Sequence, residues 1–521
     1  MKQVQKKKML SISVALVLGM QLVLSACSSD NAGNPPSSKQ PSTNKDAAVN
    51  STEDPTKDFA KLTWYIRKPV NDMSGQAEVE AVANEIIKKE INAELNFKFI
   101  DAASWEDKMR LSSAAGEEYD IALSSNTALG NRLDLNVQRG AVMPLDDLLE
   151  KYGQDILKKV DPRAWKVVTF DGQIMGIPSQ LPYSTPRAYV FKRELVEKYN
   201  YDYKSMTNKT LDELEPFLET IKQNEPDMIP LAAGPTGAPG AYNFNAIEIA
   251  KGIVYNEKTG QLTLDIDVPE TLSIYRTLND FYKKGYIAKD AATRTDTLAE
   301  LKSGNYAVMG DPGGFTEDGS KSTATYGFPT SEALYGYSLI STPSMSSAMM
   351  YISKTSKNPE RAMMLLNLVW ADRTLSNTLA FGVEDKHYTV VSGKGTDDIY
   401  VEAKSGAEQK YAVWHTWLGP LWDQWDSNWN RTEALEVMQR NNEVAETSKI
   451  LGFMFDSEPV KAEVAQVAAV VAEMQPILFT GTASDFDKYI EESKKKLLNA
   501  GADKVLAEAQ KQLDAWKNTN K

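Results

Sequence analysis

From residue 62 to residue 123 the sequence alternates between short apolar strands and amphipathic helices. The predicted strands cover residues 62–66, 95–99 and 120–123. A helix is predicted over 79–87, because apolar residues recur there at helical spacing, and a second precedes the third strand. This order implies parallel strands joined by helical crossovers. Ligands of such sheets bind beyond the carboxyl ends of the strands, which points to the loops at 67–73 and 124–127.

A chain of 521 residues is too long for one core, so we expect two or three domains, or lobes that share strands. Asp171-Gly172 predicts a hairpin between residues 165–170 and 173–177. Further predicted elements are a strand at 189–191, helices at 194–199 and 211–223, and two tail helices within 485–516 that Gly501 separates.

The first 57 residues predict an export signal and a tether. Four lysines precede an apolar run at 9–23, which is shorter than the roughly twenty residues of a membrane-spanning helix. Leu24-Ser25-Ala26-Cys27 then resembles a bacterial lipobox, in which the cysteine is lipidated with at least two acyl chains, as stable anchoring requires. We therefore expect a signal peptide at 1–26, lipidation at Cys27 and a disordered tether at 27–57, with the protein anchored on the extracytoplasmic face of the cell membrane.

Charge and composition argue against several function classes. The formal net charge of −13 opposes nucleic-acid binding, which draws its affinity from Lys and Arg. A single cysteine excludes an intrachain disulfide, and two distant histidines, His387 and His415, do not supply a zinc site or a recognisable Ser-His-Asp motif. We therefore expect no metal, no cofactor and no catalytic residues.

Five phrases of the sequence occur in an order typical of one family. They lie at residues 140–146 (GAVMPLD), 170–178 (FDGQIMGIP), 189–195 (YVFKREL), 301–309 (LKSGNYAVM) and 352–362 (ISKTSKNPERA). Together they resemble the family 1 extracellular solute-binding proteins of ABC importers, a group that includes maltose-binding protein. The resemblance covers residues 62–479, and the tail resembles the extra C-terminal segment of the LipO-like branch.

This resemblance implies an α/β fold of two lobes joined by hinge strands, with a helical extension. The crossings are expected near residues 179–183, 310–314 and 349–354. The implied division is 58–180 and 311–350 for the N-terminal lobe, 181–310 and 351–480 for the C-terminal lobe, and 481–521 for the extension. A monomer of this kind captures a ligand, expected to be an oligosaccharide, closes by hinge bending and delivers it to permease subunits of an ABC importer.

A sugar site pairs aromatic platforms with carboxylates and amides, because sugars present apolar faces and hydroxyl edges. By position and residue type, the predicted ligand-binding residues are Arg67, Ser125, Asn126, Tyr183, Asp311, Phe315, Trp414 and Trp417. For each of them a packing role is an equal alternative. Three further tryptophans (Trp422, Trp425 and Trp429) follow Gly419-Pro420 at i, i+3 and i+7, which predicts one buried helical face.

Other functions stay open at this point. A peptide- or anion-binding protein of the same fold is favoured if the cleft is basic around Arg67, Lys68 and Arg110. A secreted glycosidase would use two carboxylates that flank a cleft. A structural or sensory lipoprotein would present the same fold to a membrane receptor.

Overall fold

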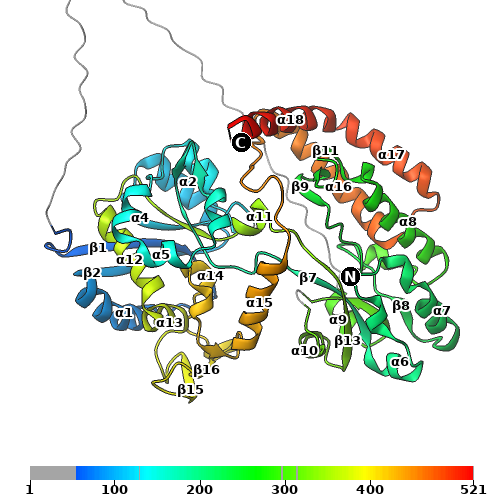
Figure 1. Ribbon diagram of the computed structural model, residues 1–521, viewed down its shortest axis with the longest axis horizontal. Coiled ribbons are helices and arrows are strands. Elements are labelled where there is room, and N and C mark those ends of the chain that lie inside the picture. The colour runs from blue at the N-terminus through cyan, green and yellow to red at the C-terminus, as the bar shows by residue number, and fades with distance from the viewer. Residues whose placement is uncertain (1–53, 128, 295–296, 313–314, 520–521) are drawn as a thin grey trace, which may run out of the picture. The chain divides into compact units, whose positions relative to one another are not determined.

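The computed structural model describes residues 54–127, 129–294, 297–312 and 315–519 (Figure 1). The predicted signal peptide, Cys27 and most of the predicted tether lie outside these residues. The described chain contains two large hydrophobic cores, and each is built around its own β-sheet. We call the residues around these cores the first lobe and the second lobe.

The first lobe is built on a five-stranded sheet in the order β2-β1-β3-β14-β6. β1 pairs in parallel with β2 and β3, as predicted, and β14 pairs antiparallel with both β3 and β6. Trp64 on β1 lies opposite Phe97 on β2, with their ring centroids 5.4 Å apart and both side chains buried. The strands are β1 (Ala60–Arg67), β2 (Ala93–Ile100), β3 (Ile121–Ser124), β6 (Ile177–Pro178) and β14 (Met349–Ile352).

Helix α1 of the first lobe buries one apolar stripe. In α1 the stripe is Val79, Ala83, Ile87 and Ile91, at four-residue spacing, and the helix ends where Asn92 adopts a left-handed conformation. The helices are α1 (Gln76–Ile91), α2 (Trp105–Ala115), α3 (Leu133–Gln138), α4 (Asp146–Tyr152), α5 (Gln154–Lys159), α11 (Thr342–Met345), α12 (Pro359–Ala371), α13 (Arg373–Phe381) and α14 (His415–Leu418). The predicted hairpin at Asp171-Gly172 forms between β4 (Thr169–Phe170) and β5 (Gln173–Ile174).

Helices α12 and α13 belong to the first lobe, which differs from the expected assignment of 351–480 to the C-terminal lobe. Leu365, Leu366 and Trp370 of α12 are fully buried in the first core. The physical reason is that α12 follows β14 directly and packs against β14 and β1. A three-stranded sheet in the order β15-β16-β17 adds to this core and comprises β15 (Tyr388–Ser392), β16 (Tyr400–Ala403) and β17 (Asp426–Ser427).

The second lobe is built on a four-stranded sheet in the order β13-β7-β12-β8. β7 runs antiparallel to both of its neighbours, and β8 runs parallel to β12, so β8, β12 and β13 all end at the edge where β7 begins. The strands are β7 (Pro186–Lys192), β8 (Ile229–Leu231), β12 (Tyr306–Gly310) and β13 (Thr330–Tyr337). The expected N-terminal segment 311–350 is therefore divided, because β13 pairs with β7 in the second lobe.

The remaining elements of the second lobe surround this sheet (Figure 1). A second, antiparallel sheet contains β9 (Ala246–Ala250), β10 (Ile253–Asn256) and β11 (Gln261–Leu264). The helices are α6 (Arg193–Lys198), α7 (Glu215–Asn224), α8 (Pro269–Lys283), α9 (Thr297–Lys302), α10 (Ser320–Tyr326), α16 (Lys461–Thr480), α17 (Phe486–Asn499) and α18 (Ala502–Thr519). The predicted helix over 211–223 begins as a 3-10 turn and becomes α7 at Glu215, which Pro216 follows.

The C-terminal extension packs as two helices, α17 and α18, against α16, as the tail pattern predicts. Gly501 separates them at a φ of 90°, a conformation that favours glycine. The segment Glu458–Thr480, which includes α16, is long and apolar enough to cross a membrane by length and composition. Its Val467, Val471 and Leu478 nevertheless lie in the second core, so here it acts as a core helix.

Within the described residues the chain passes between the lobes three times, and one crossing lies where it was predicted. Residues 179–185 connect β6 with β7. The other crossings are 338–348, between β13 and β14, and α15 (Thr432–Val444) with the residues after it. The expected crossings near 310–314 and 349–354 are wrong, because β12 and β13 belong to one sheet and 349–352 form β14.

Hydrogen bonds join the three crossing segments to one another. Ser184 Oγ donates to the carbonyl of Ser338 at 2.7 Å, and Ser184 N–H donates to Oδ1 of Asn442, on α15, at 3.2 Å. Ile340 forms a parallel bridge with Thr447. The connection between the lobes is therefore one hydrogen-bonded bundle of three segments.

Candidate ligand-binding site

A cavity of about 410 Å³ lies in the second lobe at the edge where β8, β12 and β13 end. Its walls include residues 232–234, which follow β8, Gly310 at the end of β12, and Arg187 near the start of β7. Small-molecule sites have volumes of about 300–1,000 Å³, so this cavity has the size of a ligand site. Its position also agrees with the rule that α/β sheets bind ligands beyond their carboxyl ends. We call it the ligand cavity.

The ligand cavity combines aromatic rings with a few charged groups. The aromatic residues are Tyr242, Tyr306, Tyr326, Tyr335 and Phe479, and the charged residues are Arg187, Glu300 and Asp311. The guanidinium of Arg187 lies over the ring of Tyr242, with 4.9 Å between Cζ and the ring centroid. Its Nε is buried and has no hydrogen-bond partner among the described residues. The cavity therefore offers flat apolar faces and a polar donor, the two features that sugar recognition needs.

The tyrosine hydroxyls of the ligand cavity stay protonated at neutral pH. Burial raises the pKa of Tyr242, Tyr326 and Tyr335, and it raises the pKa of Tyr306 to about 12. A protonated hydroxyl both donates and accepts hydrogen bonds, so these rings match the hydroxyl groups of a neutral ligand.

A glycine- and proline-rich loop at residues 234–240 closes one side of the ligand cavity. Gly234 and Gly237 pair across its turn. Gly240 has a φ of 73°, and a Cβ atom built there would lie 2.9 Å from the Tyr189 ring, so only glycine allows this close approach.

Of the sequence-predicted ligand residues, Asp311 lies in the ligand cavity. Its side chain is 5% exposed, its Oδ2 accepts a hydrogen bond from Ala188 N–H at 3.2 Å, and its Oδ1 lies 3.9 Å from Nη1 of Arg187. Phe315 is half-buried and is not among the described residues that line the cavity.

Ser125 and Asn126 follow β3 at the carboxyl edge of the first sheet, as predicted. Ser125 is fully buried, and its hydroxyl bonds to the Thr127 hydroxyl at 3.0 Å. Asn126 lines a smaller cavity of about 150 Å³ with residues of both lobes, and its Nδ2 donates to Sδ of Met454 at 2.9 Å. Asn126 therefore contacts a residue that follows the third crossing.

Arg67 and Tyr183 lie in two different environments. Arg67 is half-buried at the end of β1. Tyr183 is 3% exposed in the first crossing, and its hydroxyl donates to the carbonyl of Ser179 at 2.7 Å, which stabilises the turn of that crossing. The structure does not bring either residue into the ligand cavity.

The tryptophan-rich stretch 411–429 does not form the predicted helix. Residues 421–423 form a 3-10 turn and Asp426–Ser427 form β17, so the shared helical face of Trp422, Trp425 and Trp429 is a wrong prediction. The pattern misleads because residues 426–427 pair with β16 instead of continuing a helix. Trp425 and Trp429 still pack on the first core, against Phe381.

Trp414 and Trp417, the two predicted sugar platforms, differ in exposure. Trp417 is 9% exposed and belongs to the first core, whereas Trp414 is 37% exposed. The Trp414 ring meets the Trp429 ring edge-on, with 5.3 Å between centroids. Trp414 therefore has the open face that a stacking ligand requires.

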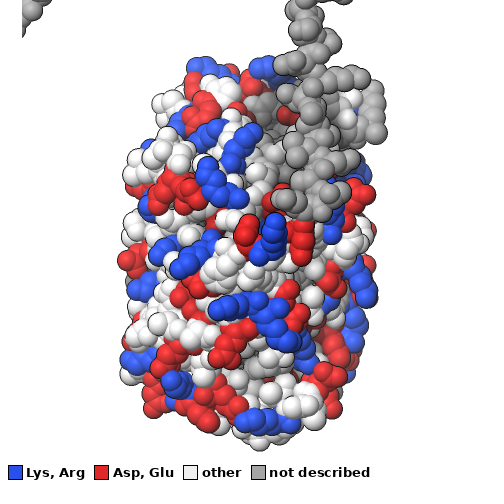
Figure 2. Space-filling model, turned by 90° about the vertical axis from the view of Figure 1, so that its left-hand side faces the viewer, with Lys and Arg blue, Asp and Glu red and all other residues white. Residues whose placement is uncertain are grey.

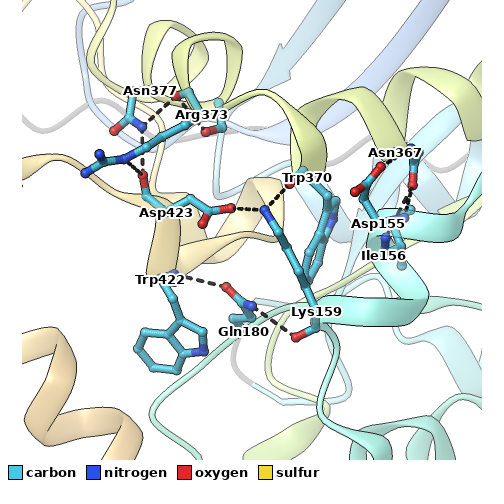
Figure 3. Close-up of polar contacts among 11 residues, drawn as sticks. Asp155, Ile156, Lys159, Gln180, Asn367, Trp370, Arg373, Asn377, Trp422 and Asp423 are labelled. Atoms are coloured by element: carbon cyan, nitrogen blue, oxygen red, sulfur yellow. Dashed lines mark hydrogen bonds and ion pairs between the residues drawn. The ribbon is translucent and has the colours of Figure 1, made fainter. Parts of the chain in front are cut away.

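A polar network holds this stretch on the first lobe (Figure 3). Lys159 Nζ donates to Oδ2 of Asp423 at 2.7 Å, and Arg373 Nε donates to the carbonyl of Asp423 at 3.0 Å. Gln180, in the first crossing, donates to the carbonyl of Lys159 and accepts from Trp422 N–H at 3.0 Å. Figure 3 shows the Trp422 indole pointing away from these contacts. The stretch is thus fixed through two backbone groups and the Asp423 carboxylate, without a hydrogen bond from the Trp422 ring among the contacts drawn.

Sequence reasoning missed most of the ligand cavity, including Arg187, Tyr242 and Tyr335. These residues come from β7, a loop and β13, and only the order of strands in the second sheet brings them together. One available signal was the glycine-rich loop directly after the strand at 229–231, at the kind of edge where α/β sheets bind ligands.

Two α/β lobes, three crossings and an aromatic cavity at a carboxyl sheet edge define a solute-binding protein. The chain belongs to the bacterial extracellular solute-binding protein family, whose model matches residues 72–371. This membership places the protein outside the cytoplasm. A second model, a domain of unknown function (DUF3502), matches residues 449–518, which contain α16, α17 and most of α18.

Individual relatives agree with this assignment. A carbohydrate ABC transporter substrate-binding protein of Streptococcus pneumoniae serotype 4 is 30% identical over 450 residues, which are 85% of this chain and 89% of the relative. The crystal structure of an N-glycan transport solute binding protein from Streptococcus pneumoniae is 27% identical, has a TM-score of 0.72 and covers 89% of this chain and 100% of its own. That protein has also been solved in complex with Man5GlcNAc, with a TM-score of 0.58 to this chain.

Proposed function

We propose that the protein captures an oligosaccharide and delivers it to the permease of an ABC importer. The ligand cavity carries this proposal, because it places five aromatic residues beside an arginine with an unpaired Nε and a buried carboxylate. The N-glycan transport protein, which has been solved with a bound glycan, supports the same ligand class. The ligand occupies the cavity of the second lobe and is contacted by the first lobe on closure, with Trp414 as the first-lobe platform.

The charges of the site favour a neutral sugar over an anionic ligand or a peptide carboxylate. The ligand cavity contains one arginine and two carboxylates among its described lining residues. In the first lobe, Lys68 lies 3.4 Å from Asp101 and Arg110 lies 3.1 Å from Asp107, so these cations are paired. Figure 2 shows acidic and basic side chains interspersed over one face of the molecule, without a basic stripe among the coloured atoms. The charge pattern therefore lacks the feature that would favour a polyanion.

The same proposal includes an anchor and excludes catalysis. Lipidation of Cys27 holds the protein on the outer face of the cell membrane, and the tether at 27–57 lets the folded lobes reach the permease. Transport requires that the ligand leaves unchanged, so the protein needs no catalytic residues.

Isothermal titration of the purified protein with mannose-containing glycans, other neutral oligosaccharides, uronides and peptides tests the proposal. We expect saturable binding of a neutral oligosaccharide, and mass spectrometry should recover that sugar intact. Binding of a peptide without any sugar would contradict the ligand class. New reducing ends would instead identify a glycosidase.

A further inference from the structure

A second cavity, of about 230 Å³, lies in the second lobe beneath the C-terminal extension. The β9–β11 sheet and α8 form one side of it, and α16 and α17 form the other. It shares Ala241, Tyr242 and Phe479 with the ligand cavity. Its volume lies below the range of drug-sized sites, about 300–1,000 Å³, so it suits a small molecule. We call it the extension cavity.

The charged residues of the extension cavity are all acidic. They are Asp265 and Glu248, and no lysine, arginine or histidine is among the described residues that line it. The Asp265 carboxylate accepts hydrogen bonds from the Thr271 hydroxyl and the Tyr275 hydroxyl, each at 3.1 Å. No ion pair of Asp265 with a lysine or arginine occurs in the described part of the chain.

A carboxylate in this position is costly unless a cation accompanies it. Burial raises the pKa of Asp265, and the hydrogen bonds from Thr271 and Tyr275 act in the opposite direction. Its neighbour on the same 3-10 turn, Asp267, lies 2.8 Å from Lys494 of α17. Asp267 and Glu248 thus each pair with a lysine, whereas no lysine or arginine pairs with Asp265 among the described residues.

The remaining walls suit the apolar body of an organic cation. Tyr242, Tyr275 and Phe479 contribute aromatic rings, and the centroids of Tyr275 and Phe479 lie 5.9 Å apart at a steep angle. Met474 and Leu497 add aliphatic surface. Aromatic faces attract alkylammonium ions, and a carboxylate beside them supplies the counter-charge.

We propose that the extension cavity binds a small organic ammonium ion, whose cationic head pairs with Asp265 and whose apolar body packs between α16 and the aromatic rings. Glu248, which is exposed and pairs with Lys251 at 2.9 Å, lies at the edge of the cavity. This site adjoins the ligand cavity, with which it shares three wall residues, but its proposed ligand does not depend on the oligosaccharide proposal.

Calorimetric titration of the full protein with choline, with ethanolammonium and with the uncharged carbon analogue of choline, dimethylbutanol, tests this inference at constant ionic strength. We expect saturable binding of at least one of the two ammonium ions and none of dimethylbutanol. The absence of saturable binding by both ammonium ions overturns the proposal. Equal binding of dimethylbutanol also overturns it, because the cavity would then be an apolar site.

Matched variants locate the binding. Asp265→Asn keeps the size of the side chain and should weaken ammonium binding about tenfold or more. Asp267→Asn makes the same charge change two residues away and should leave the affinity unchanged. Glu248→Gln alters an exposed side chain, so it should fold normally and weaken binding by a smaller factor. Unchanged affinity in both Asp265→Asn and Glu248→Gln overturns the assignment, and if Asp265→Asn fails to fold, the Glu248→Gln result decides.

Discussion

Arg187 lies over the ring of Tyr242, with 4.9 Å between its Cζ and the ring centroid, at the edge of the second sheet. The same guanidinium lies 3.9 Å from Asp311 Oδ1, beyond the usual hydrogen-bond range of about 2.7–3.2 Å. Its position is thus set by stacking on the ring and by charge. The side chain is 32% exposed and lines the ligand cavity, so its guanidinium can donate to a ligand hydroxyl.

Replacing Arg187 with Met should weaken oligosaccharide binding at least about tenfold, because the ligand loses a charged donor, an interaction worth about 1.5–3 kcal/mol. Arg139→Met provides the control, since Arg139 is exposed at the end of α3. Titration calorimetry of both variants measures the effect. If the Arg187→Met and Arg139→Met proteins bound the oligosaccharide with equal affinity, Arg187 would not be a ligand-binding residue.

Alanine variants of Trp414 and Trp417 should have different effects, one on oligosaccharide binding and the other on stability. Trp417→Ala should lower the free energy of unfolding by about 3–5 kcal/mol, because it deletes a large side chain from the first core. Trp414→Ala should change stability by less than about 1 kcal/mol and should weaken oligosaccharide binding. Urea unfolding and calorimetry measure the two effects. If Trp414→Ala left binding intact, Trp414 would be a surface residue without a role as a platform.

Asn442 should contribute more to the unfolding free energy than its position on a surface helix suggests. Its amide donates to the carbonyl of Leu181 at 2.8 Å and accepts from Ser184 N–H at 3.2 Å, and the residue is 6% exposed. Asn442→Ala leaves both buried groups unpaired, which should cost about 1–3 kcal/mol for each group in the unfolding free energy. Asn441→Ala, on the same turn of α15, should cost much less. Similar unfolding midpoints for the two variants would contradict the role of Asn442.

His415 should make the protein less stable as the pH falls. Burial, with a smaller contribution from Arg373, lowers the pKa of His415 to about 3. Between about pH 6.5 and pH 3 the imidazole is therefore protonated in the unfolded chain and neutral in the folded chain. The contribution of neutral His415 to the unfolding free energy is fully present above the unfolded pKa of about 6.5. It falls by about 2 kcal/mol between pH 7 and pH 5. Burial also lowers the pKa of His387, which acts in the same direction.

The variant His415→Gln tests this assignment, because glutamine can still donate to Asn377 Oδ1, which lies 3.1 Å from Nε2 of His415. The difference in unfolding free energy between the two proteins should shrink or reverse as the pH falls from 7 to 5. A pH-independent difference would show that His415 does not titrate in this range.

Cys27→Ser should release the protein from cells into the medium, because the acyl anchor is lost. Ser28→Ala, one residue along, should leave the protein in the membrane fraction. Immunoblots of membrane and medium fractions measure the distribution. If the Cys27→Ser protein stayed in the membrane fraction, the lipid anchor would be refuted.

The sequence predicts local elements well where one apolar pattern decides them. β1, α1, β2 and β3 appear where the alternation near residue 60 places them, because each buries a stripe of its own residues. The same holds for α17 and α18, which Gly501 separates. These features depend on contacts between neighbours in the chain or in one sheet.

The assignment of elements to lobes could not be predicted in this way. Nothing in the composition of β13 or α12 indicates which lobe it joins, since either core could bury the apolar residues of each. The ligand cavity depends on that pairing, so the sequence did not indicate Arg187 or Tyr335. Asp311 was predicted because a crossing between the lobes was expected at 310–314, and that crossing is wrong. The tryptophan pattern failed for a related reason, because a pairing with β16 overrode the helical spacing.

The helical form of the third crossing restricts how this protein can open and close. A helix resists bending between its ends, so the backbone torsions that change during closure must lie beside α15, near Arg431 and Ala445, and not within it. The pairing of Ile340 with Thr447 couples the second crossing to one of these points. We therefore expect the lobes to rotate about the two ends of α15 when they close, with the helix itself unchanged.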